Sequence, residues 1–224
     1  MPPRRPGPPR GETAREARTS AGDMLRAAML GPDESRRATV DRLGGTRAVA
    51  GMLGKSARSV RRWASGQTRS FRGDANQRLA TADVRDRMNR RGLSVDPTTG
   101  TPTAAMRIQT RGWVSIRGSS GSDTYEYERR VGNQGGAQGG HQLRGDTVTT
   151  MANSFAAGDN EAALQAFERQ MTGDWVGVPG ASSREEAEAA YDPNPDGHVG
   201  FRQTEMHDVG IYTDNGGGTG PLFP

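Results

Sequence analysis

The sequence predicts an α+β protein: a helical helix-turn-helix domain, then a small domain of a β-hairpin or sheet plus helices, with disordered termini. Two changes of pattern support this prediction. Apolar residues recur at helical spacing up to about residue 91, whereas residues 106–117 alternate with a period of two, as in a half-exposed β-strand. Between them, residues 97–102 are rich in Pro, Thr and Gly, which is typical of a linker.

The helix-turn-helix is predicted at residues 46–63. The apolar positions that would form its core are Val49, Ala50, Leu53, Val60 and Trp63. Gly54 stands where the first helix must leave through a left-handed residue, a conformation that glycine adopts without a Cβ clash. Ser56 can cap the second helix by accepting a hydrogen bond from a free backbone N–H. Small, turn and apolar residues therefore all fall where this motif needs them.

The positions of the second helix that stay outside this core are basic or carry hydroxyls. Arginine at such positions can bond guanine edges or clamp phosphates, so the expected partner is double-stranded DNA. Flanking residues suit backbone contacts that set the register. The predicted DNA contacts are Thr46, Arg47, Ser56, Arg58, Ser59, Arg61, Arg62 and Arg69, with Ser65 and Arg72 beside them.

Composition and charge agree with this partner. Only 32% of the residues are hydrophobic and 5% aromatic, with 32 Gly and 13 Pro, which is too little apolar material to bury the whole chain. Residues 1–91 carry 21 Lys and Arg against 9 Asp and Glu, whereas residues 151–224 carry 3 against 12. The basic part indicates a polyanion, and the acidic part indicates a protein partner or shielding of the basic part.

Several function classes are not expected. The chain has no cysteine and no apolar stretch near 20 residues, so we expect a soluble protein of the cytoplasm, associated with the nucleoid, with no membrane partner. The three histidines, His141, His198 and His207, are scattered, which predicts no metal site. No glycine loop of the phosphate-binding kind is present. We therefore expect neither a cofactor nor a self-contained enzyme.

The rest of the chain divides by composition and period. The predicted divisions are a disordered basic arm (1–18), the helical domain (19–92), a linker (93–104), a small α+β domain (105–212) with a Gly-rich insert (132–140), and a disordered tail (213–224). In the α+β domain we expect a hairpin of strands at 106–117 and 124–131, helices at 146–157, 161–171 and 182–191, and a strand within 199–212. One face of the first strand carries Arg107, Arg111 and Trp113, which could contact nucleic acid or simply face solvent.

The order of these parts resembles a known family. The stretch GTRAVAGMLGKSARSVRRW is similar to the helix-turn-helix of the telomere terminal proteins of linear bacterial chromosomes and plasmids. TRGWVSIRGSSGSD, ANSFAAGDNEAALQAFERQM and VGFRQTEMHDVGI stand where that family has a strand and hydroxyl-containing turn, a helix pair, and a final strand. The resemblance covers about residues 44–212, and the insert at 132–140 departs from it.

The resemblance implies an unusual role. Proteins of that family are joined covalently to the 5′ ends of linear DNA, and a side-chain hydroxyl primes the DNA polymerase. The family's turn maps onto Ser119, Ser120, Ser122 and Asp123, where serines and an inserted glycine replace the usual threonine pair. Ser120 is the first candidate primer, then Ser122 and Ser119. The implied partners are a DNA polymerase and a telomere-associated DNA-binding protein.

Two other functions remain open from the residues. A helix-turn-helix transcriptional regulator of a plasmid or phage would use the same DNA contacts and would need a homodimer to set half-site spacing. A non-catalytic adaptor would recruit replication proteins through the acidic segment, so removal of residues 181–224 would abolish its function but spare a regulator. An exposed hydroxyl in the 119–123 turn distinguishes a primer from both.

Overall fold

The computed structural model describes residues 12–93, 96, 106–117, 124–131, 140–176, 178, 181–194, 198–213 and 218–219. Over these residues the chain is α+β, as predicted. The helices are α1 (Glu12–Leu30), α2 (Arg36–Arg42), α3 (Gly45–Leu53), α4 (Ala57–Ala64), α5 (Ala75–Arg90), α6 (Gly145–Ala157), α7 (Asn160–Met171) and α8 (Arg184–Ala189), with a π-helix, η1 (Thr172–Val176), directly after α7. The strands are β1 (Met106–Arg117), β2 (Thr124–Val131), β3 (His141–Leu143), β4 (Gly200–Gln203), β5 (Asp208–Thr213) and β6 (Gly218–Thr219).

The sheet is antiparallel and is built around β1. One edge of β1 pairs with β3 and then β2, and the other edge pairs with β5 and then β4. The predicted strand within 199–212 is therefore two strands, separated by residues 204–207. This segment crosses close to Gly112, where an added Cβ would overlap the carbonyl oxygen of Glu205. The glycine lets the backbones approach at this point.

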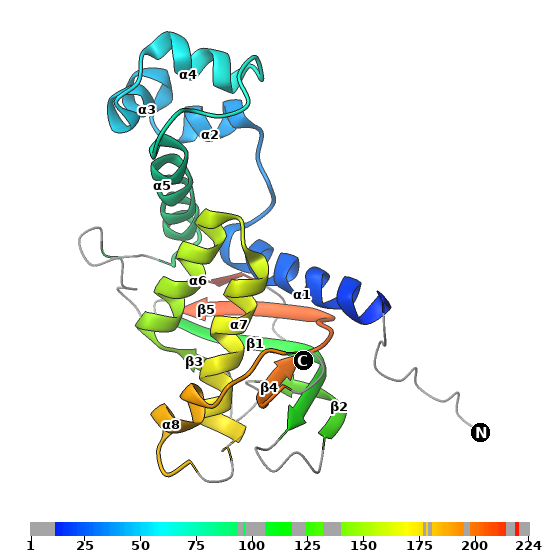
Figure 1. Ribbon diagram of the computed structural model, residues 1–224. Coiled ribbons are helices and arrows are strands. Elements are labelled where there is room, and N and C mark those ends of the chain that lie inside the picture. Colours follow the sequence, from blue (N-terminus) through cyan, green and yellow to red (C-terminus); the bar gives the residue numbers. More distant parts are fainter. Residues whose placement is uncertain are drawn as a thin grey trace.

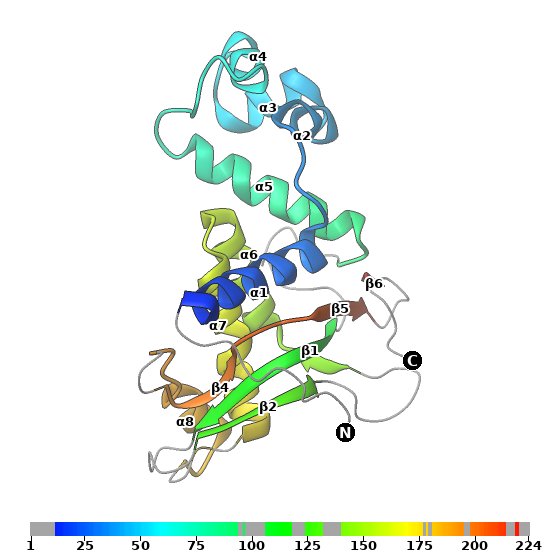
Figure 2. The same cartoon turned by 90° about the vertical axis from the view of Figure 1, so that its right-hand side faces the viewer.

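The apolar face of the sheet is covered by α1, α6 and α7, which lie on one side of it (Figure 2). Ile108 on β1 is paired with Ile211 on β5, and both are fully buried. Phe201 on β4 meets Phe167 of α7 edge to face, with ring centroids 5.9 Å apart. This packing is the larger of two hydrophobic cores, and we call the part of the protein around it the body.

A second, smaller core holds together α2, α3, α4 and the first half of α5, which we call the head. Its buried side chains include Val40, Val49, Leu53, Val60, Phe71 and Leu79. α5 spans both cores, because Leu79 is buried in the head whereas Met88 is buried in the body. Figure 1 shows α5 running from the head, at the top, down to the body.

α1 differs from its prediction in extent and in place. It begins at Glu12, so residues 12–18, which were predicted in the disordered arm, are helical. Its apolar side chains, Leu25 and Met29 among them, join the body core, although the sequence groups residues 19–30 with the helix-turn-helix. The physical reasons are this apolar burial and a buried ion pair, in which Arg18 Nη1 donates to Glu168 Oε1 of α7 at 2.7 Å. That pair gives the start of α1 a fixed partner in the body.

The other predicted elements are found with small changes. The helices predicted at 146–157 and 161–171 are α6 and α7, and the acidic helix predicted at 182–191 is the shorter α8. Residues 218–219, predicted within a disordered tail, pair with β5 as β6. Among the helices described, none is long and apolar enough to cross a bilayer.

Candidate nucleic-acid interface

Two helices joined by a tight turn, α3 and α4, form the outer end of the head. Gly54 ends α3 in the left-handed region with φ of 62°, as its position in the sequence predicts. Ser56 then caps α4, because its Oγ accepts a hydrogen bond from Ser59 N–H at 3.1 Å. Val60 is fully buried against α3, whereas Trp63 is half-buried. The opposite side of α4 is thereby turned to solvent.

That outer side of α4 presents three arginines that have no partner in the described part of the chain. Arg58, Arg61 and Arg62 are exposed, and their guanidinium groups make no hydrogen bond or ion pair to the residues that the structure describes. The same is true of three exposed arginines on either side of α4, which are Arg47, Arg69 and Arg72. All six can therefore bind an external anion without first breaking a contact within the described part of the protein.

Two other arginines of the head and its junction with the body, Arg42 and Arg87, are used internally. Arg42 of α2 is held by three carboxylates, those of Glu34, Asp83 and Asp86, and its contact with Asp86 measures 2.6 Å. Burial opposes its charge, but the hydrogen bonds to these carboxylates outweigh burial and raise the pKa of Arg42. Arg87 donates to the carbonyl oxygens that end α1, including Leu30 O at 2.9 Å. Among the described residues of the head, six of the exposed arginines without such contacts lie on α4 and its flanks, and Arg37 of α2 is another.

The segment after α4, residues 65–73, is held in place by a residue that the sequence analysis missed. Arg36 donates to the carbonyl oxygens of Thr68 at 2.9 Å and Arg69 at 3.2 Å. Its guanidinium also lies 5.2 Å from the centroid of the Trp63 ring, a cation–π contact. Farther on, the side-chain amide of Asn76 pairs with both the N–H and the carbonyl of Phe71, each at 2.9 Å. Arg69 and Arg72 therefore stand on an organised segment.

The remaining predicted contacts of the head are less available. Ser56 and Ser59 share a hydrogen bond between their hydroxyls at 2.9 Å, so both take part in the cap of α4. Thr46 is half-buried near the start of α3. α4 itself lies at the end of the head that points away from the body, with open space around it (Figure 1).

The predicted contacts on the sheet lie in a different setting. Arg107, Arg111 and Trp113 of β1 are half-buried, and both arginines already interact within the protein. On the same face, Gln109 and Ser115 are buried. The side chains on this face are more buried than the alternating pattern predicts. Alternation shows which side chains share a face of the strand, but it does not show what packs against that face. A role in DNA binding stays a prediction for these three residues.

The candidate priming hydroxyls, Ser119, Ser120 and Ser122, lie outside the described residues. Arg117, the last residue of β1, directly precedes their segment. All three histidines have polar contacts: His141 Nε2 lies 3.0 Å from Asp174 Oδ2, His198 Nε2 lies 3.1 Å from Ser115 Oγ, and His207 Nε2 lies 3.3 Å from Glu205 Oε1. Within the part of the chain that the structure describes, no three His, Asp or Glu side chains gather as a metal site requires.

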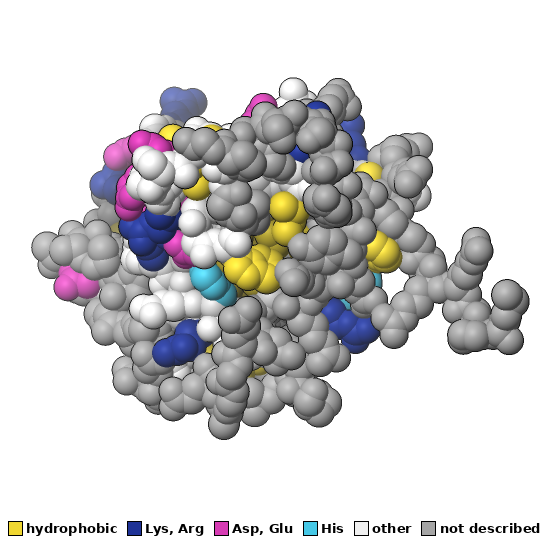
Figure 3. Space-filling model, turned by 90° about the horizontal axis from the view of Figure 1, so that it is seen from below, with side chains coloured by type: hydrophobic (Ala, Val, Ile, Leu, Met, Phe, Trp, Pro, Cys, Tyr) yellow, Lys and Arg dark blue, Asp and Glu magenta, His cyan; other side chains and the backbone are white. Residues whose placement is uncertain are grey.

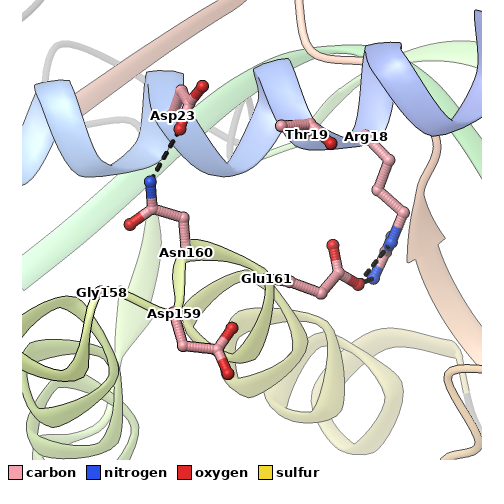
Figure 4. Close-up of a pocket in the computed structure, with 7 residues that line it drawn as sticks. All are labelled: Arg18, Thr19, Asp23, Gly158, Asp159, Asn160 and Glu161. Carbon is pink, nitrogen blue, oxygen red and sulfur yellow. Dashed lines mark hydrogen bonds and ion pairs between the residues drawn. The ribbon is translucent and has the colours of Figure 1, made fainter.

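Two other surfaces of the body differ from the head. A pocket between α1 and the start of α7 is lined by acidic side chains that already have partners (Figure 4). There Glu161 binds Arg18, Asp23 binds Asn160, and Asp159 caps α7. On the face opposite the head, the described Lys and Arg side chains stand singly, with hydrophobic side chains near the centre (Figure 3). No such concentration of free arginines as on α4 is seen on either surface among the described residues.

Comparison with known proteins gives no further guide. No protein-family model matches the chain, and no curated protein or solved structure is significantly similar to it. The geometry of the head is therefore the strongest basis for a function.

Proposed function

We propose that this protein binds double-stranded DNA through its head, as a helix-turn-helix module with α4 in the major groove. One observation carries the proposal: Arg58, Arg61 and Arg62 are exposed on the outer side of one capped helix and have no partner among the described residues. A single helix fits the major groove, and guanidinium groups bond guanine edges or phosphates there.

The flanking arginines contact the DNA backbone, whereas α4 contacts the groove. Arg69 and Arg72, on the segment held by Arg36 and Asn76, bind phosphates beside the groove, and Arg47 does so at the start of α3. Such contacts fix the register of the module without reading sequence. The carboxylates around Arg42 keep that arginine out of the interface.

The biological role that we propose for this DNA binding is the one implied by the resemblance to the telomere terminal proteins: the protein caps the 5′ ends of linear DNA and primes DNA synthesis. In priming, a serine hydroxyl oxygen attacks the α-phosphorus of a deoxynucleoside triphosphate, a phosphodiester bond forms, and pyrophosphate leaves. The polymerase and its metal ions accept the hydroxyl proton and activate the phosphate, since a hydroxyl is a weak nucleophile. Ser120 is the first candidate, then Ser122 and Ser119.

DNA binding is tested by fluorescence anisotropy of labelled duplexes over a range of salt concentrations. We expect R61Q and R62Q each to weaken binding by about 1–3 kcal/mol, and R69Q to lower the salt slope by about 1. The control is R15Q, which removes the same charge from an exposed residue of α1 in the body. Equal losses in R15Q and in the α4 variants would refute the assignment of the interface.

Priming is tested separately with the host polymerase, a telomeric 3′ overhang and labelled deoxynucleotide. A denaturing gel and peptide mass spectrometry then look for a nucleotide on residues 118–124. An adduct lost in S120A or S122A supports the terminal-protein role. Without an adduct, tight salt-sensitive binding at a palindrome would overturn that role and identify a transcriptional regulator.

A further inference from the structure

Two arginines and a histidine come together on the outer face of the sheet, at the end of β1. The register pairs Ser115 of β1 with Arg202 of β4, and Arg117 with Gly200. Because side chains alternate along a strand, Ser115, Arg117 and Arg202 share the face opposite the helices, whereas Ile116 and Phe201 share the helix-covered face. The cluster lies in the body, away from α4 (Figure 1).

His198 completes this cluster. Its ring is buried, with 5% of the residue exposed, and its Nε2 lies 3.1 Å from Ser115 Oγ. Burial, together with the positive charges of Arg202 and Arg117, lowers the pKa of His198 to about 4. Both guanidinium groups therefore act on this imidazole, which is neutral at neutral pH.

Among the described residues, Arg202 has no partner of the kind that a half-buried charge needs. Its Nε is fully buried with no hydrogen-bond partner, and its guanidinium makes no hydrogen bond or ion pair to the described residues. The nearby carboxylates of Glu168 and Glu161 are already bonded to Arg18. Burial and the charge of Arg18 accordingly lower the pKa of Arg202. An unpaired buried charge is costly, so this arrangement indicates a missing anion.

We propose that Arg202, Arg117 and His198 form a binding site for a nucleotide phosphate group. Guanidinium groups donate pairs of hydrogen bonds that match phosphate oxygens, which favours phosphate over a small spherical anion. The choice of a nucleotide as the source rests on the proposed function, because Arg117 directly precedes the segment that carries the candidate priming serines. The phosphate belongs either to a free nucleotide or to the 5′ end of a DNA strand.

The site is tested in the full chain by NMR of the histidine ring signals, with H198N used to assign those of His198. Inorganic phosphate, a deoxynucleoside monophosphate and single-stranded oligonucleotides with and without a 5′-phosphate are titrated in turn. We expect a saturable shift of the His198 signals and a rise of its pKa by about one unit or more, since a bound anion favours the protonated ring. R202Q should weaken binding at least tenfold, and R202K should restore it in part by keeping the charge.

The controls separate this site from the head. R61Q, which the proposed function places in the duplex interface, should leave the His198 response unchanged, and R202Q should leave duplex binding unchanged. Thermal unfolding of R202Q and R202K checks that both variants fold. No response of His198 to any probe would overturn the site, even with duplex binding intact. If His198 responds to inorganic phosphate but responds equally to the oligonucleotides with and without a 5′-phosphate, the site is supported and the DNA 5′ end is excluded as its ligand.

Discussion

Glu168 is the residue whose change should destabilise the body most clearly. The residue is fully buried in α7, and its two carboxylate oxygens accept four hydrogen bonds. Oε1 accepts from Arg18 Nη1 at 2.7 Å and from Gln203 N–H at 2.6 Å. Oε2 accepts from Arg18 Nη2 at 2.8 Å and from the Tyr191 hydroxyl at 2.6 Å. One carboxylate thus joins α1, α7, β4 and Tyr191, two residues after the end of α8.

Glu168→Gln keeps the shape of the side chain and removes its charge. Breaking a buried ion pair by removing one partner costs about 3–5 kcal/mol, because the other charge stays buried. Here Glu161 also binds Arg18, at 2.6 Å, from a side chain that is 44% exposed. That second carboxylate compensates part of the loss, so we expect a destabilisation near the lower end, about 3 kcal/mol.

The measurement is urea unfolding of the full chain, monitored by circular dichroism, and the control is Glu16→Gln, which removes an exposed carboxylate of α1, the helix that carries Arg18. Glu16→Gln should change the free energy of unfolding by less than about 0.5 kcal/mol. A double variant, R18M with E168L, should lose less stability than the sum of the losses in its two single variants, since it leaves no unpaired charge in the core, and Glu161, which also loses Arg18, is partly exposed. A loss below about 1 kcal/mol in Glu168→Gln would refute the reasoning.

Three further predictions concern other parts of the chain. Gly112→Ala should destabilise the protein by about 1–3 kcal/mol in thermal unfolding, because its Cβ would overlap Glu205 O; an unchanged melting temperature would contradict the close approach. Arg36→Gln should weaken duplex binding through Arg69, so its effect should shrink in a double-mutant cycle with Arg69→Gln, whereas full additivity would show independent action. His198 has a pKa of about 4 in the folded protein against an ordinary 6.5. Its contribution to the free energy of unfolding is therefore complete above pH 6.5 and is lost as the pH falls towards 4. The loss should reach about 3 kcal/mol in unfolding experiments and disappear in H198N.

Local features were predictable because neighbouring residues encode them. The left-handed Gly54, the capping Ser56 and the buried side of α3 follow from residue type and helical spacing. The period of two over residues 106–117 likewise predicts β1, whose bounds it matches. The α+β class, the helices α6 and α7 and the strand β1 were therefore determined by the sequence alone.

Tertiary structure decided what depends on partners far apart in the chain. α1 belongs to the body because Arg18 meets Glu168, a pairing that no local spacing encodes. The free arginines of α4 could be told from buried Arg42 only once the positions of the carboxylates were known. Arg202 and His198 are both brought to Ser115, near the end of β1, by the pairing of β1 with a strand distant in sequence. Spacing along the chain thus fixes which face a side chain takes, whereas long-range packing determines what that face meets.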